Sequence, residues 1–204
     1  MTYAGKNRMR LLAAATGWAL LLSPVIALGQ SSNPAVGVVK NFYAKVEAIM
    51  RSGQDIQGRF AQLKPAMLAA FNTPAMIRTA LGTKWDELSP EAKKRLETAY
   101  SDFVVAVYAS KIDGYSGEKF EVEAGSVGQR RGQMIFTKII DSKGVVHGVN
   151  YIVGPDLKIS DTIFDGTISE LASRRAEFTS IIDRSGPDEL VRSLSGRVDK
   201  LLQR

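Results

Sequence analysis

The feature that most constrains the fold is a change in the spacing of apolar residues along the chain. Up to about residue 112, apolar side chains recur at intervals of three and four, which is typical of amphipathic helices. From about residue 118 to 165 the interval is two, as in strands, and after residue 167 it returns to three and four. Helices and strands that are segregated into blocks in this way predict an α+β protein.

The first helical block, residues 33–112, contains clear start signals. Asn33, Thr73 and Ser89 each precede a proline, and this pairing of a capping residue with proline at the first helical position predicts three helix N-termini. Pro65 falls inside the predicted second helix, where we expect it to bend or split the helix.

The longest predicted helix runs from Pro90 to about Ile112 and has an unusually wide apolar face. Its main apolar stripe contains Tyr100, Phe103 and Val107, and several alanines widen it. Such a face has to be buried against the rest of the protein, against a ligand, or against both. The sequence by itself does not decide between these partners.

Four segments in the middle of the chain read as strands joined by short turns, which predicts a four-stranded antiparallel meander. The segments are residues 118–124, 131–140, 145–154 and 157–165.

A second helical block, residues 167–202, follows the strands. Thr167 and Glu170 have the spacing of a capping box, so we expect the block to begin there. Gly186 and Pro187 interrupt the block and predict two helices.

The first 29 residues are typical of a secretory signal peptide. A basic start is followed by the apolar run "LLAAATGWALLLSPVIA" and by the small residues of "ALG", which predicts cleavage after Gly29. An uncleaved membrane anchor is the alternative. Residues 30–204 are then expected to form a single domain. The chain has no cysteine, so an exported product without disulfides indicates the periplasm, with secretion as the second choice.

Charge and motifs exclude several classes of function. The formal net charge is +6, and removal of the three basic residues of the signal peptide leaves +3, which is too small to indicate nucleic-acid binding. No metalloprotease, P-loop or nucleophile-elbow motif occurs, so we expect no catalytic set, cofactor or metal. An enzyme that uses Asp161 and His147 as acid and base remains the catalytic alternative, and it requires both side chains to face one cavity.

Large apolar side chains come from every predicted element. Most must be core, but a sheet covered by helices can leave an interior cavity that binds an apolar ligand. Helix and strand faces give the candidate lining as Phe71, Met76, Trp85, Tyr100, Phe103, Val107, Met134, Phe136, Val149, Tyr151, Ile163 and Phe178. Two arginine pairs are candidates for contact with an anionic head group or a partner, with a solvated surface as the alternative: Arg130 and Arg131, and Arg174 and Arg175.

The stretch "LGTKWDELSPEAKKRLETAYSDFVVAVYASKIDGY" resembles the signature segment of the MlaC-like family, also called the toluene-tolerance or auxiliary transport family. The matching residues are Leu81, Gly82, Trp85, Leu88, Ser89, Pro90, Glu91, Tyr108, Ala109 and Tyr115. The resemblance continues into "FDGTISELASRRAEFTSIIDRSGPDELVRSL" and covers the whole predicted mature chain. Within this second stretch, "DGTISELASRR" is closer to the hopanoid-biosynthesis-associated branch of the family.

The resemblance implies a periplasmic lipid carrier in which helices pack on a curved sheet, a cone similar to that of nuclear transport factors with extra helices. Such a carrier takes lipid tails into its interior and shuttles phospholipid or hopanoid between the inner and outer membranes. Its implied partners are the lipid, an inner-membrane ABC transporter complex and an outer-membrane lipoprotein complex. A non-catalytic scaffold of a lipid-synthesis and transport system, with a filled core, is the alternative.

Overall fold

The computed structural model describes residues 33–129, 132–164 and 166–203, all within the unit Ser32–Arg204. The predicted signal peptide, residues 1–29, lies outside the described residues, and so do Arg130 and Arg131. Within the described ranges, no helix is both long enough and apolar enough to cross a bilayer.

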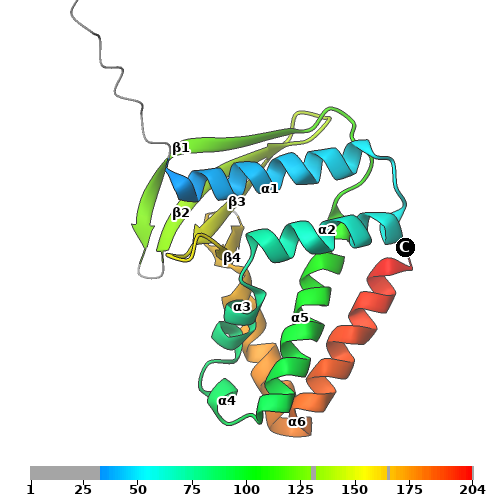
Figure 1. Cartoon of the computed structure of the whole chain (residues 1–204), viewed down its shortest axis with the longest axis vertical. Helices are drawn as coiled ribbons and strands as arrows, with labels where there is room; N and C mark the ends of the chain where they lie inside the picture. The colour runs from blue at the N-terminus through cyan, green and yellow to red at the C-terminus, as the bar shows by residue number, and fades with distance from the viewer. Residues whose placement is uncertain (1–32, 130–131, 165, 204) are drawn as a thin grey trace, which may run out of the picture. The chain divides into compact units, whose positions relative to one another are not determined.

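The order of elements along the described residues is five helices, five strands and a last long helix (Figure 1). This confirms the α+β class predicted from the change in apolar spacing. The helices are α1 Pro34–Arg51, α2 Ile56–Ala70, α3 Thr73–Leu81, α4 Thr83–Asp86, α5 Pro90–Lys111 and α6 Glu170–Leu202.

The helix start signals were mostly right. The side chain of Asn33 accepts a hydrogen bond from the amide of Ala35, and Ser89 caps α5 in the same manner. The prediction for Thr73 was wrong by one residue, because Asn72 is the cap of α3 and Thr73 is buried in its first turn. Pro65 lies inside α2, which remains one continuous helix.

The sheet is an antiparallel meander in which each strand pairs with the next along the chain. It has five strands among the described residues, one more than predicted: β1 Lys119–Gln129, β2 Gly132–Ile140, β3 Val146–Val153, β4 Ile159–Phe164 and β5 Ile168–Ser169. The extra strand is only two residues long, too short to show a period of two in the sequence.

This fifth strand also overturns the predicted start of the last helix. Ile168 and Ser169 pair with the end of β4, so Thr167 lies in the preceding turn and forms no capping box. Ser169 caps α6 instead, since its hydroxyl accepts a hydrogen bond from the amide of Ala172. Gly186, at φ 77° and ψ 174°, divides α6 into a first arm (170–185) and a second arm (187–202), as the sequence predicts.

Helix α1 lies across one face of the sheet, here called the inner face (Figure 1). The strand register places Phe120, Thr137, Tyr151 and Thr162 on this face. A hydrogen bond of 2.7 Å joins the hydroxyls of Tyr43 on α1 and Thr137 on β2. The core is therefore formed between α1 and the inner face of the sheet.

Five aromatic rings occupy this core, with centroid separations of 5.0 to 6.4 Å and several edge-to-face contacts. Such contacts stabilise beyond the burial of area alone, by about 0.5–1.5 kcal/mol for each pair. The rings belong to Phe42, Tyr43, Phe71, Tyr108 and Tyr151.

Candidate functional site

An apolar cavity with a volume of about 360 Å³ lies beside α5. The helix supplies lining residues at the spacing of a single helical face, from Tyr100 through Phe103 and Val107 to Lys111. Met76 of α3 also contributes to the wall. The wide apolar face of α5 therefore has two partners, because part of it is packed in the core and part of it lines this cavity.

The wall opposite α5 is formed by the end of the sheet. Thr162 and Phe164 of β4 line the cavity from this side. Phe164 is 38% exposed, and Ile168, its pairing partner on β5, is 52% exposed. Two large apolar side chains are thus partly exposed at this end of the sheet, where an apolar ligand could cover them.

The lining of the cavity is rich in aromatic rings: Tyr100, Phe103, Tyr108 and Phe164. Most binding pockets for small molecules have volumes of about 300–1,000 Å³ and a lining of this apolar kind. The cavity can therefore hold an apolar group. Its charged lining residues are Lys111, Glu170 and Arg174, and Arg174 Nε donates to the Glu170 carboxylate at 2.8 Å.

One buried polar group at this cavity lacks a partner. The Tyr108 hydroxyl lies beside those of Thr162 and Tyr151, yet it forms no hydrogen bond of ordinary geometry with a described residue. Burial raises the pKa of Tyr108 to about 12, so the phenol is neutral under physiological conditions.

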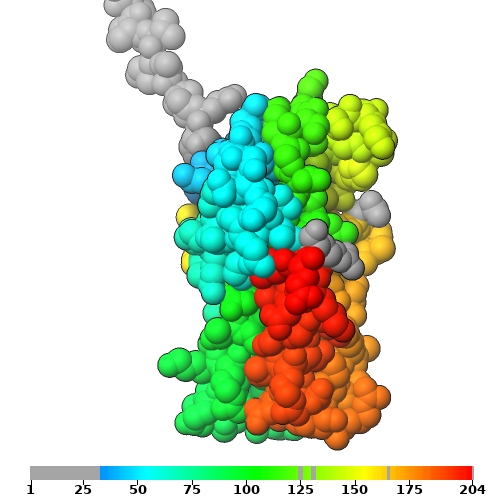
Figure 2. All heavy atoms as spheres, turned by 90° about the vertical axis from the view of Figure 1, so that its right-hand side faces the viewer, coloured from blue at the N-terminus to red at the C-terminus, as the bar shows by residue number. Residues whose placement is uncertain are grey.

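A second cavity of about 390 Å³ adjoins the first, and we call it the basic basin. It shares Phe103, Val107, Lys111 and Arg174 with the apolar cavity, and its other lining residues are Ser110, Arg197, Lys200 and Leu201. Figure 2 looks onto the side of the molecule where the second arm of α6, in red, lies next to α2 and α5. The basin is built where the C-terminal ends of α5 and α6 approach each other.

Two carboxylates hold the arginines of the basin in place. Arg174 Nε donates to Glu170 Oε1 at 2.8 Å, and a second nitrogen of Arg174 lies 3.7 Å from Glu177. Arg197, on the other arm of α6, also donates to Glu177. The guanidinium of Arg174 lies 5.3 Å from the ring centroid of Phe103, so it covers an aromatic wall of the apolar cavity with a cation.

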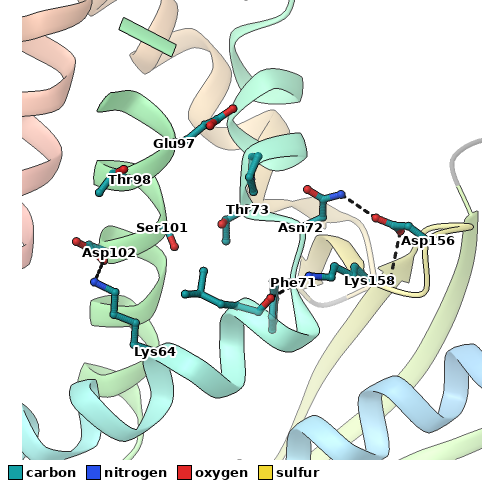
Figure 3. A pocket seen from close by; sticks show the side chains of 12 residues that line it. Lys64, Phe71, Asn72, Thr73, Glu97, Thr98, Ser101, Asp102, Asp156 and Lys158 are labelled. Atoms are coloured by element: carbon teal, nitrogen blue, oxygen red, sulfur yellow. Dashed lines mark hydrogen bonds and ion pairs between the residues drawn. The ribbon is translucent and has the colours of Figure 1, made fainter. Parts of the chain in front are cut away.

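A further cavity, of about 480 Å³, opens between α2, α3 and α5 (Figure 3). Its lining residues are mostly polar or charged, and their contacts include Lys64 Nζ to Asp102 Oδ1 at 2.7 Å and Asn72 Nδ2 to Asp156 Oδ2 at 2.7 Å. Phe71 is the only aromatic residue among its described lining. The cavity beside α5, by comparison, has four aromatic lining residues.

The structure brings together some of the predicted lining residues and separates the others. Met76, Tyr100, Phe103 and Val107 line the apolar cavity, and Phe71 lines the charged one. The remaining predicted residues line none of these described cavities. Trp85, Tyr151 and Phe178 are buried in the core, Val149 packs against it, and Met134, Phe136 and Ile163 lie on the outer face of the sheet.

The two members of the described arginine pair, Arg174 and Arg175, also lie apart in their contacts. Arg174 lines both the apolar cavity and the basin, whereas Arg175 points elsewhere and donates to the carbonyl of Thr79 at 2.8 Å. The lining residues that we did not include are Val104, Tyr108, Lys111, Thr162, Phe164 and Glu170. Helical spacing from Tyr100 contains a signal for the first two, but those on β4 are brought near α5 only by the tertiary fold.

The acid–base hypothesis fails on the strand register. His147 pairs with Ile139 on the inner face, whereas Asp161 pairs with Ile152 on the outer face. His147 contacts Asp141 at 3.3 Å, and Asp161 accepts from the Ser169 hydroxyl at 2.6 Å. In the part of the chain that the structure describes, no group of three or more His, Asp and Glu side chains could hold a metal ion.

Fold and site together define a protein that covers one face of an antiparallel sheet with helices and keeps an apolar, aromatic cavity with a basic margin. The chain matches the MlaC protein family over residues 40–196, and it belongs to that family. Among curated protein sequences, none matches it.

One solved structure with the same fold is a phospholipid-binding protein from Ralstonia solanacearum, determined in complex with a phospholipid. The two chains superpose with a TM-score of 0.67 at 18% sequence identity, over 82% of this chain and 98% of the other. This similarity confirms the predicted arrangement of helices on an antiparallel sheet.

Proposed function

We propose that this protein is a non-catalytic lipid carrier that takes an apolar lipid tail into the cavity beside α5. The observation that supports this most directly is the aromatic lining of Tyr100, Phe103, Tyr108 and Phe164. Burial of apolar tail surface in such a cavity is favourable by about 25 cal/mol per Å². The phospholipid bound by the solved protein of the same fold supports the same ligand class.

The carrier acts in the periplasm, where it moves lipid between the inner and outer membranes. This part of the proposal rests on membership of the MlaC family and on the signal-like residues 1–29. A lipid tail has to be shielded from water during such a transfer, which the cavity allows. Its partners are an inner-membrane ABC transporter complex and an outer-membrane lipoprotein complex, one of which donates the lipid and the other accepts it. The cargo is a phospholipid or a hopanoid.

The first test is native mass spectrometry of the protein purified from periplasm without detergent, followed by lipid extraction. We expect a retained mass that matches a phospholipid or a hopanoid. A protein that stays empty, and that also takes up no lipid from vesicles, contradicts the proposal and favours a scaffold with no cargo.

A cavity-filling variant links the retained lipid to this site. Val107→Trp places an indole where the apolar cavity and the basin meet, whereas Val145→Trp adds the same ring at a position that is 50% exposed at the end of the β2–β3 hairpin. Retained lipid should fall in the first variant and stay unchanged in the second. Equal retention in both would place the lipid elsewhere.

A further inference from the structure

The basic basin has more positive charge than its own carboxylates neutralise. Lys111, Arg174, Arg197 and Lys200 line it, and two glutamates, Glu170 and Glu177, contact the arginines. The surroundings therefore carry an excess of two positive charges. Neither lysine forms an ion pair with a carboxylate of the described residues.

The arginines and the lysines have different roles in this arrangement. Arg174 and Arg197 are held by Glu170 and Glu177, so their positions are fixed before any ligand arrives. Lys111 of α5 and Lys200 of α6 are exposed and line the basin, so their ammonium groups can turn toward a ligand. Ser110 adds a hydroxyl at the same margin, although that hydroxyl donates to the Val107 carbonyl at 2.8 Å.

The basic basin directly adjoins the apolar cavity. Phe103, Val107, Lys111 and Arg174 line both, so a molecule with its tail between α5 and β4 can place its polar end at the basin. Arginine and lysine recognise phosphate through charge-assisted hydrogen bonds, arginine with a planar fork and lysine as a point charge.

We propose that the basic basin is a subsite for the phosphate of a lipid head group, and that it makes the carrier prefer anionic over uncharged lipids. The inference rests on the proposed function, because the lipid tail fixes the phosphate at the basin. Lys111 and Lys200 supply the selectivity, and the two arginines, already paired with carboxylates, supply the oriented wall. The simpler role for these lysines is to complement the C-terminal dipoles of α5 and α6.

The test compares two lipids with the same acyl chains, phosphatidylglycerol, which carries one negative charge, and diacylglycerol, which carries none. Each is offered in phosphatidylcholine vesicles, and the lipid retained by the full mature protein is measured by mass spectrometry. We expect the unmodified protein to retain about threefold to tenfold more phosphatidylglycerol, which lies within the range that two exposed charge pairs give together. Added salt should reduce this preference because it screens exposed charges.

The decisive variant is Lys111→Gln with Lys200→Gln, and its matched control is Lys40→Gln with Lys45→Gln. The control lysines lie on exposed positions of α1 and line none of the described cavities. Their substitution removes the same net charge as the substitution of Lys111 and Lys200. We expect the first double variant to lose the preference for phosphatidylglycerol and the control to keep it. Circular dichroism and thermal unfolding of both variants verify that each is folded.

The outcomes separate this inference from the proposed function. Retention of both lipids without a preference, or a preference that the basin variant keeps, overturns the phosphate subsite and leaves the lipid carrier intact. Retention of no lipid at all, phosphatidylcholine included, overturns both, whereas retention of phosphatidylcholine alone overturns only the preference for anionic lipid. Inorganic phosphate is titrated calorimetrically as well, and if it binds at the basin while the lipids show no preference, the basin is a site for the free ion and the head-group assignment is wrong.

Discussion

The guanidinium of Arg197 and the carboxylate of Glu177 join the two arms of α6 across the break at Gly186. The residues are 20 positions apart in the sequence, so this contact exists only because the second arm turns back along the first. It also places Arg197 next to Arg174 at the basic basin, since both arginines contact Glu177. The contact therefore links the shape of α6 to the charge of the site.

This contact should make stability depend on pH. The hydrogen bond from Arg197 lowers the pKa of Glu177, with further lowering by the charges of Arg197 and Arg174 against opposing desolvation. A carboxyl group with a lowered folded-state pKa stabilises the fold above its unfolded pKa, and the contribution is lost as pH falls through the folded value. Urea unfolding at neutral pH and at about pH 3 should therefore show that the free energy of unfolding falls less on acidification in Glu177→Gln than in the unmodified protein. An equal fall in the free energy of unfolding in both proteins would contradict the role given to Glu177 and Arg197.

Tyr43→Phe should destabilise the protein, because it removes the buried hydrogen bond between Tyr43 and Thr137. A typical loss is about 1 kcal/mol in the free energy of unfolding. Thr137 keeps a second contact, since its hydroxyl also donates to the Val149 carbonyl, so the loss should not be much larger. Chemical denaturation of the purified mature protein measures the change.

Tyr108→Phe should have the opposite effect and raise the free energy of unfolding. The hydroxyl of Tyr108 is buried and lacks a hydrogen bond of ordinary geometry to the described residues, so removing it relieves a desolvation cost of about 1 kcal/mol. The ring remains and keeps its packing against Phe42 and Phe71. The two tyrosine variants differ from the parent by one oxygen each, so denaturation curves with shifts in the same direction would refute this account of the hydroxyls.

Gly186→Ala should weaken the fold. At φ 77° and ψ 174°, the backbone of Gly186 lies in a region that is open essentially to glycine alone, and a side chain there costs about 1–3 kcal/mol. Gly196→Ala is the matched control, because Gly196 is helical and a methyl group there would meet no atom within 4 Å. The control should be neutral or slightly stabilising. A comparable loss of melting temperature in both variants would mean that the conformation of Gly186 is not the cause.

Val107→Trp should lower affinity for an apolar probe with little effect on stability. Val107 is only partly buried and lines both the apolar cavity and the basin, so the indole would occupy ligand space and would not enter the packed core. Loss of about 55 Å² of tail contact corresponds to about 1.4 kcal/mol, or about tenfold in affinity. Fluorescence titration with a pyrene-labelled diacylglycerol gives the dissociation constant. An unchanged constant would exclude this cavity as the tail site.

Local patterns in the sequence were sufficient to predict most elements. Asn33 and Ser89 cap their helices as predicted, and Gly186 interrupts the last helical block, because caps and breaks depend on the residues next to them. The errors at Thr73 and Thr167 have a local cause as well. Asn72 competes with Thr73 for the cap, and the two-residue strand Ile168–Ser169 displaces the start of α6.

Only part of the lining of the site could be predicted from patterns in the sequence. A helical face is defined by spacing within one segment, so Tyr100, Phe103 and Val107 could be assigned to a common wall from the sequence. Period two in a strand says which residues share a face but not which face is covered by α1, and the structure has the candidate lining residues Met134, Phe136 and Ile163 on the outer face. The sequence by itself thus determined the class of fold and the apolar wall of α5. Only the tertiary structure decided that β4 closes the cavity and that Lys111 and Arg197 share its margin, because those neighbours come from segments that are distant in the sequence.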